Sequence, residues 1–243
     1  SQRGIARRLG IGKTTVNTWS KELGFHYIKH TVNEKFFDDF NEFSVYLLGL
    51  IYADGNIAWN PAKGYQSLTI TASEKDKDHL KRIRNLLQST KPLLYSSKTN
   101  SYRLIVNNKI ICLRLMELGV TPRKSLTVTF PSFLDKDQLS PFLRGIIDGD
   151  GNVRYVSRNR SPYFEITIAS GSKEFCDGLI NAVEEVVNIK AKARKVGQNT
   201  FVIQYSCKRG EELARFVYSN AQLLLQRKYV EYQKCVEAKN DKF

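Results

Sequence analysis

The chain is poor in the residues that build zinc sites, disulfide frameworks and membrane spans. It contains 4 cysteines and 3 histidines in 243 residues, and the cysteines, at positions 112, 176, 207 and 235, form no CxxC pair. We therefore expect reduced thiols in an intracellular protein. His26 and His30 lie four residues apart, but they have no further ligands nearby and are interpreted as surface residues. No segment approaches the ~18 apolar residues of a membrane span, and no signal peptide is recognisable.

Acidic residues are also scarce relative to basic ones. The 24 aspartates and glutamates face 38 lysines and arginines, which gives a formal net charge of +14. Such an excess is typical of proteins that bind a polyanion, usually nucleic acid. A solvated basic surface is the alternative. A hydrophobic content of 42% with 11% aromatics excludes wholesale disorder, and the length allows one large domain or two of about 100 to 150 residues.

Two halves of the chain share one plan. The segment YLLGLIYADGNI recurs 96 residues later as FLRGIIDGDGNV. Further pairs follow in the same order with small changes of spacing: SLTITASEKD with EITIASGSKE, YRLIVNNK with FVIQYSCK, and PRKS with QRKY. Two copies of this length indicate an internal duplication rather than a solenoid. Within each copy, hydrophobic periodicity predicts helix, strand, strand, helix, strand, strand and helix, which is an α+β fold.

Each copy places an aspartate and a glycine directly after an apolar helix, at Asp54 and Asp150. Both helices also carry small residues four apart, Gly49 with Ala53 and Gly145 with Gly149. That spacing puts the small residues on one face and allows two helices to pack closely. We expect the two helices to meet at the midline and to bring both aspartates together, where a divalent cation such as Mg²⁺ would offset their repulsion. The alternative is an Asp-Gly turn that merely ends each helix.

LLGLIYADG and LRGIIDGDG resemble the paired signature of the LAGLIDADG homing endonucleases in their single-chain, two-motif form. The resemblance spans roughly residues 43–235. It implies pseudo-two-fold αββαββα halves whose two curved antiparallel sheets form a DNA-binding saddle. It also implies site-specific cleavage of both DNA strands, with short 3′ overhangs and a divalent metal. Tyr52 departs from the pattern, because an aspartate is common at that position, whereas the second motif keeps Asp148.

The resemblance also implies the residues of the catalytic site. The last acidic residue of each motif, Asp54 and Asp150, would bind metal, and Ala53 and Gly149 stand beside them in the expected metal site. By order of elements, the catalytic lysine of each half corresponds to Lys124 and Lys228, for which an ordinary solvated lysine is the alternative. A polar residue after the second strand would hold solvent, and the mismatched candidates for this role are Glu74 and Ser172.

DNA contacts are expected on strand residues that face away from the helices. Alternation along NVRYVSRNR puts its arginines on one face, where they can pair with guanine edges or phosphates. An ordinary solvated sheet face is the alternative. The candidates are Thr69, Thr71 and Arg103 in the first half and Arg154, Arg158, Arg160, Thr167, Lys192 and Arg194 in the second.

The N-terminal segment resembles a helix-turn-helix. Apolar residues mark one helix before Gly10 and another that begins near Thr14. The second helix would present Lys13, Thr15, Asn17 and Thr18 to DNA. The segment is shorter than the usual three-helix unit, so it is interpreted as a partial domain or as a helical extension packed on the body. The predicted division is a helix-turn-helix-like segment at 1–25, a linker at 26–42, and LAGLIDADG halves at 43–134 and 135–243.

The sequence thus predicts a monomeric, metal-dependent endonuclease of double-stranded DNA. We expect Mg²⁺ as the cofactor, with Mn²⁺ as a substitute, and a long target that is near-palindromic or asymmetric. The expected location is intracellular and DNA-associated: the cytoplasm of a bacterium or phage-infected cell, or an organelle. The alternative is an inactive DNA- or RNA-binding module on the same fold, such as an intron maturase or a regulator. An intein is disfavoured, because no splice-junction cysteine or terminal His-Asn is present.

Overall fold

A computed structural model describes residues 2–24, 30–60, 62, 64–157 and 162–240 of the chain. The chain divides into two compact units, Ser1–Thr31 and Val32–Phe243. From residue 32 onward, the segment interpreted as a linker (residues 26–42) packs on the second unit. Phe37 is buried, and the backbone N–H of Asn33 donates to the carbonyl of Leu87 at 2.9 Å. These residues belong to the second unit because they cover its apolar core.

The first unit is a helical hairpin, α1 (Gln2–Leu9) and α2 (Lys13–Glu22). The turn between the helices uses Gly10 at φ +65°, a conformation that glycine adopts at little cost. Ala6 and Val16 are the buried apolar residues of this pair of helices. Four other apolar side chains of this unit are at least 46% exposed: Ile5, Leu9, Trp19 and Leu23. The core predicted for this segment therefore consists of two small side chains.

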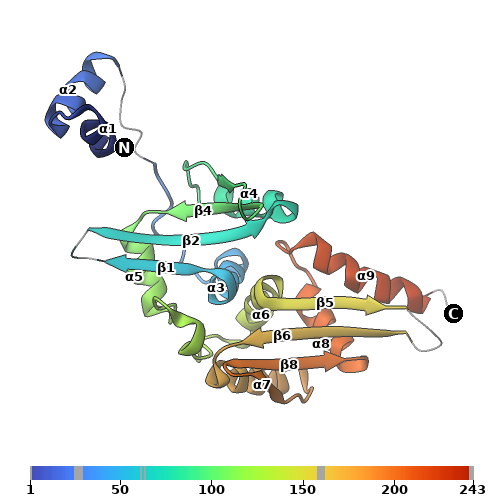
Figure 1. Cartoon of the computed structure of the whole chain (residues 1–243). Coiled ribbons are helices and arrows are strands. Elements are labelled where there is room, and N and C mark those ends of the chain that lie inside the picture. Colours follow the sequence, from blue (N-terminus) through green and yellow to red (C-terminus); the bar gives the residue numbers. More distant parts are fainter. Residues whose placement is uncertain (1, 25–29, 61, 63, 158–161, 241–243) are drawn as a thin grey trace. The chain divides into compact units, whose positions relative to one another are not determined.

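The second unit contains the predicted duplication (Figure 1). Its two four-stranded antiparallel sheets have the same strand order, β1-β2-β4-β3 and β5-β6-β8-β7. The first half contains α3 (Glu42–Asp54), β1 (Asn56–Asn60), β2 (Tyr65–Ser73), the 3-10 turn η2 (Glu74–Asp76), α4 (Lys77–Leu86), β3 (Leu94–Ser96), β4 (Ser101–Val106), α5 (Lys109–Glu117) and η3 (Lys124–Leu126). The second contains α6 (Lys136–Asp150), β5 (Gly151–Val156), β6 (Tyr163–Ser170), α7 (Lys173–Val187), β7 (Ala193–Gly197), β8 (Thr200–Ser206), α8 (Lys208–Tyr218) and α9 (Gln226–Asn240).

Each sheet has one apolar face and one polar face, as strand alternation requires. On β2, Leu68 and Ile70 are buried in the core, so Thr69 and Thr71 lie on the opposite face. On β6, Ile166 and Ile168 are buried in the same way. The helices pack on the apolar faces, and the polar faces stay open. This arrangement confirms the predicted α+β fold.

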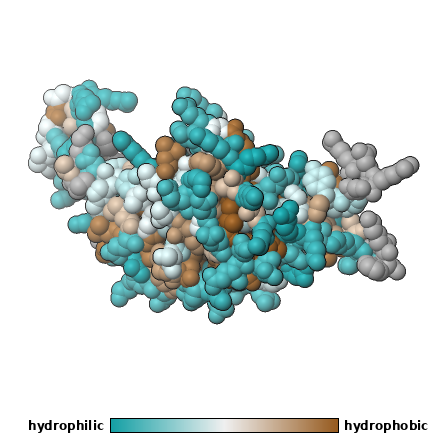
Figure 2. Space-filling model, turned by 90° about the horizontal axis from the view of Figure 1, so that it is seen from below, coloured by the Kyte–Doolittle hydropathy of each residue, from teal (hydrophilic) through white to brown (hydrophobic). Residues whose placement is uncertain are grey.

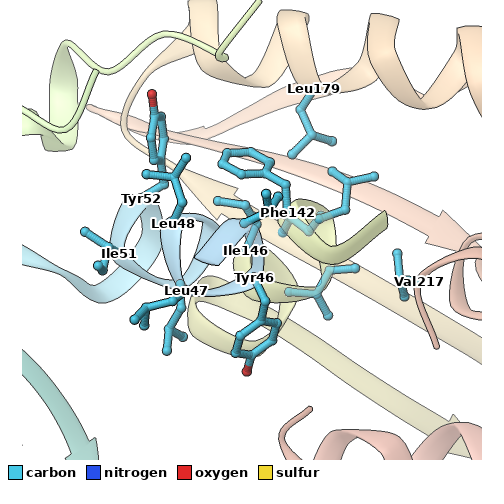
Figure 3. Close-up of a cluster of buried hydrophobic side chains, with 14 of the residues drawn as sticks. Tyr46, Leu47, Leu48, Ile51, Tyr52, Phe142, Ile146, Leu179 and Val217 are labelled. Carbon is cyan, nitrogen blue, oxygen red and sulfur yellow. The ribbon is translucent and has the colours of Figure 1, made fainter. Parts of the chain in front are cut away.

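The two motif helices, α3 and α6, lie side by side between the sheets (Figure 1). Both begin at a capping box, in which Asn41 pairs with Ser44 and Asp135 pairs with Gln138. Large apolar side chains of both helices surround the contact, as Figure 3 shows. The prediction that they pack closely at the midline is confirmed.

Glycines allow this close packing. A Cβ atom added to Gly49 would lie 2.1 Å from the carbonyl oxygen of Phe142, and one added to Gly145 would lie 2.1 Å from that of Tyr46. A Cβ added to Gly149 would lie 2.4 Å from the Cβ of Ala53. Backbone therefore meets backbone at Gly49 and Gly145, and the small side chain of Ala53 fills the contact at Gly149.

Helix α9 has no counterpart among the described residues of the first half. It packs along β5, the edge strand of the second sheet. The backbone N–H of Tyr155 on that edge donates to Glu231 of α9 at 3.0 Å. A free strand edge is thereby covered, which removes a template for pairing with another chain.

Most of the surface in the view of Figure 2 is hydrophilic, with hydrophobic residues scattered among the polar ones. Leu126 and Phe133 are among the exposed apolar side chains. Among the described residues, no helix is both long and apolar enough to cross a bilayer.

Candidate active site at the junction of the motif helices

The carboxylates of Asp54 and Asp150 stand at the C-terminal ends of α3 and α6. The next residue in each chain segment, Gly55 or Gly151, donates its N–H back to the helix and turns the chain into a strand. A Cβ on Gly151 would lie 2.4 Å from the carbonyl oxygen of Ile147, so this tight exit requires glycine. The Asp-Gly pair therefore does end each helix, and the close packing also brings the two carboxylates together.

The environment of Asp54 and Asp150 disfavours the charged form of both carboxyl groups. Both side chains reach solvent, yet partial burial raises the pKa of each carboxyl group. For Asp150 the pKa rises to about 6, because the charge of Asp54 adds to the effect of burial. The negative ends of two helix dipoles point at the same place and disfavour the anionic forms further. A positive charge between the carboxylates would relieve all three effects.

The two predicted lysines lie at this junction and are both buried. Lys124 of η3 donates from Nζ to the carbonyl oxygen of Ala53 at 3.0 Å. Lys228 of α9 contacts four carbonyl oxygens at the end of α6, those of Ile147 (2.7 Å), Asp148 (2.8 Å), Gly149 (3.3 Å) and Gly151 (2.5 Å). Lys228 thus caps α6, because helix ends leave carbonyls without partners. Burial lowers the pKa of Lys228 to about 8.

The motif position that differs between the halves has a comparable structural role in both. In the first half, the Tyr52 hydroxyl donates to the carbonyl of Leu118 at 2.6 Å. In the second, Asp148 accepts from the N–H of Leu225 at 2.8 Å. Each bond fastens the segment that leads to the lysine of its half. The departure at Tyr52 therefore preserves the attachment while changing its chemistry.

Asp148 also belongs to a buried polar network between the motif helices. Tyr46 donates to it at 2.8 Å and lies 2.9 Å from Nε2 of His79. Burial raises the pKa of Asp148 to about 6. Nearby, Arg144 is 1% exposed and donates to Glu42 at 2.6 Å. These contacts join α3, α4, α6 and the segment before α9.

A cavity of about 240 Å³ opens beside Asp54. Asp76 and Arg227 line it and form an ion pair with Nε and Oδ1 3.0 Å apart. Glu74, the sequence candidate here, is exposed at the start of η2 and does not line this cavity. Ser172 is buried and caps α7 by accepting from the N–H of Phe175 at 3.2 Å. The geometry gives neither of these two residues a contact with the paired aspartates.

The donor atoms at the junction suit a hard divalent cation. Two carboxylates and the carbonyl oxygens of Ala53 and Gly149 are all oxygen ligands, although each carbonyl already accepts from a lysine. Among the described residues, no cluster of three or more His, Cys, Asp or Glu could hold a metal ion. Mg²⁺ commonly binds through one or two carboxylates, with water and substrate phosphate as its other ligands. The residues present fit that pattern.

The candidate DNA contacts of the first half lie together on the polar face of its sheet. Thr69 and Thr71 face away from the core, and Arg103 is directly opposite Thr71 on β4. In the second half, Arg154, Thr167 and Arg194 are on the polar face of the other sheet, and Lys192 is exposed just before β7. Strand β5 ends at Val156, and Arg158 and Arg160 lie outside the described residues.

The N-terminal candidates are accessible. Helix α2 begins at Lys13, one residue before the predicted start. Lys13, Thr15, Asn17 and Thr18 are all exposed on it. Val16, which lies between them in sequence, is the side chain that α2 buries.

Comparison with known families supports the second half most directly. The family model of a LAGLIDADG-like domain matches residues 137–219. This range runs from the start of α6 to the end of α8 and contains the second motif. No curated protein sequence matches the chain. The second half is therefore similar in sequence to a LAGLIDADG-like domain.

Solved structures extend the likeness to both halves. The chain is similar to the I-LtrWI LAGLIDADG homing endonuclease bound to target DNA, with 13% identity, TM-score 0.56, and coverage of 84% of this chain and 92% of the other. It is similar to the meganuclease I-AabMI bound to uncleaved DNA, with 14% identity, TM-score 0.57 and coverages of 83% and 92%. It is also similar to I-DmoI in complex with DNA and Ca, with 16% identity, TM-score 0.52 and coverages of 73% and 88%. The chain has the duplicated fold of the LAGLIDADG homing endonucleases.

Sequence reasoning did not find several polar residues of these surfaces. Arg227, Asp76 and His79 are brought together only by the tertiary fold, and no spacing in the sequence links them. Glu165 lies on the polar face of β6 opposite Arg154. The alternation in FEITIAS does place it there, so strand periodicity could have identified it.

Proposed function

We propose that this chain is a site-specific endonuclease that hydrolyses both strands of DNA as a monomer with Mg²⁺. The observation that carries the proposal is the junction of α3 and α6, where Asp54, Asp150 and Lys124 converge. Burial raises the pKa of both carboxyl groups, and a divalent cation between them would offset the cost of their negative charges. The fold and the DNA-bound neighbours support a DNA substrate.

Each residue of the site has a role in phosphodiester hydrolysis. Asp54 and Asp150 would hold the metal, and with it the attacking water, beside the scissile phosphate. When bound, the divalent cation neutralises phosphate charge and promotes ionisation of water. Lys124 donates to one carbonyl in the described structure, so its ammonium has hydrogens left for the charge that develops on the phosphate. Lys228 keeps the end of α6, and with it Asp150, in position.

The polar faces of the two sheets form the proposed DNA surface. A groove beside β7 and β8 is lined by four cationic residues, Lys190, Lys192, Arg194 and Arg209. The positive charge gathered in this groove suits the phosphates of a duplex. The exposed residues of α2 are proposed as an additional contact with DNA, because the second helix of such hairpins commonly enters the major groove. A nuclease of this kind would act wherever its DNA target is located in the cell.

The second candidate is a binding module on the same fold, such as a maturase or regulator without cleavage. Retention of both Asp54 and Asp150 favours the nuclease. The test is to select binding sites for the purified chain from a random duplex library and then add Mg²⁺ or Mn²⁺. The nuclease cuts both strands of its selected site and leaves short 3′ overhangs. A protein that binds its selected site but leaves it intact with both metals is the binding module.

A further inference from the structure

An acidic side chain lies in the middle of the proposed DNA surface of the second half. Glu165 is on the polar face of β6, because its neighbours Phe164 and Ile166 are buried in the core. It is nevertheless only 6% exposed, since other side chains cover it. A carboxylate facing phosphates is unfavourable unless it is paired. The hydrogen-bond partners of Glu165 therefore indicate its role on this surface.

Both oxygens of Glu165 are occupied by neighbours from two other strands. Arg154 of β5 donates from Nε to Oε1 at 3.2 Å, and its Nη2 forms an ion pair with the same oxygen at 3.1 Å. Gln204 of β8 donates to Oε2 from its amide nitrogen, and Ser206 donates to the same oxygen at 3.3 Å. Strand register puts Arg154 and Ser206 directly opposite Glu165. The carboxylate thus fixes an arginine on one side and a glutamine on the other.

The fixed arginine presents donors to solvent. Its side chain is 50% exposed, and Tyr163 holds its other side, with the hydroxyl 3.2 Å from Nη2. Nη1 makes no hydrogen bond within the described residues. A guanidinium held at one edge by a carboxylate offers its remaining N–H groups in a fixed direction. The Nη1 amino group is the one left to donate, and it can reach an acceptor such as O6 or N7 of guanine in the major groove.

The fixed glutamine presents an acceptor. Because its amide nitrogen donates to Glu165, its carbonyl oxygen faces the other way. Gln204 is exposed and also lines the basic groove that contains Lys192, Arg194 and Arg209. An outward carbonyl accepts from the amino group of adenine or cytosine. Gln204 therefore lies between Arg154, which is proposed to contact a base, and the basic groove, which is proposed to contact phosphates.

We propose that Arg154, Glu165 and Gln204 form a base-reading unit, with Glu165 as its positioning residue. Arg154 reads a guanine, Gln204 reads a neighbouring base with an amino group, and the adjacent basic groove holds the flanking phosphates. The proposal rests on the proposed function, because it needs DNA on this sheet. It extends the proposed function by naming the bases that the second half prefers and by assigning the control of that preference to Glu165.

The test is selection of bound duplexes from a random library by the full chain in Ca²⁺, followed by sequencing of the bound pool. Glu165→Gln keeps the shape but removes the charge that holds Arg154, and Arg154→Ala removes the reader. The matched control is Glu185→Gln on α7, which removes an exposed carboxylate paired with Lys136. Thermal melting of each variant establishes that it is folded.

Wild type is expected to enrich a guanine at one fixed position of the half-site. Both Glu165→Gln and Arg154→Ala should reduce that preference at least about tenfold and leave distant positions unchanged. The control should keep the wild-type profile. An unchanged profile for Glu165→Gln would overturn the base-reading unit while leaving the nuclease proposal intact. A wild-type protein that enriches no sequence would overturn both.

Discussion

The two lysines of the catalytic junction occupy equivalent places in the duplication but have different contacts. The ammonium of Lys228 has three hydrogens and four carbonyl neighbours, so none of its hydrogens is left over. The Lys124 ammonium donates to one carbonyl in the described structure. The duplication in the sequence predicted both positions but could not distinguish them, because the distinction lies in helix-end carbonyls that only the fold assembles.

Lys228→Met is expected to destabilise the protein. It leaves the carbonyls at the end of α6 without their donor in a buried place, where an unsatisfied group costs about 1–3 kcal/mol. We expect a loss of about 2–4 kcal/mol in the free energy of unfolding, measured by urea denaturation. Lys173→Met, which removes a surface lysine paired with Asp177, is the control and should change little. Equal stability of the two variants would show that Lys228 is not a cap.

Lys124→Met should act on catalysis instead. The loss of a charge that meets the transition state lowers the single-turnover cleavage rate, whereas DNA affinity changes little. We expect a rate at least about 100-fold lower on saturating target, since one lost electrostatic contact costs about that much. Measured affinity over a salt series separates this role from simple phosphate binding. A variant that cuts at the wild-type rate would make Lys124 an ordinary buried lysine.

At the scale of elements, the packing of α3 on α6 depends on glycine. Gly145→Ala puts a Cβ where the carbonyl of Tyr46 and the N–H of Leu50 already lie. The helices must separate, so we expect a destabilisation of about 2–3 kcal/mol despite the better helix propensity of alanine. Gly197→Ala is the control, because its nearest neighbour atoms are 3.7 Å away. Denaturation midpoints compare the two, and a neutral Gly145→Ala would contradict the close contact.

Local patterns predicted most of the elements correctly. Alternation in SLTITAS places Thr69 and Thr71 opposite the core, and the small residues of the motif helices predicted their contact. Helix α9 was not predicted, because the duplication implies equal halves and the first half has only the short turn η3 at the matching place. Helix α9 supplies both Glu231, which binds the edge of β5, and Arg227, which pairs with Asp76.

At the scale of the whole molecule, the formal charge of +14 gives DNA binding a strong dependence on salt. Each phosphate neutralised releases counterions, so affinity falls with salt in proportion to the number of contacts. If about six to ten phosphates are contacted, affinity should fall about 10³–10⁵-fold between 50 and 200 mM salt. Fluorescence anisotropy with a labelled duplex measures this slope. A flat response would show that the basic surface is merely solvated.

The most direct measurement is strand-resolved cleavage of the selected target by wild type, Asp54→Asn and Asp150→Asn, beside equilibrium binding of the same duplex. In Mg²⁺, wild type should cut both strands, and neither variant should make a double-strand break. Both variants should bind DNA as tightly as wild type or more tightly, because each loses a negative charge near phosphate. Loss of binding in parallel with cleavage, or cleavage that survives both substitutions, would mean that the two carboxylates are only helix ends.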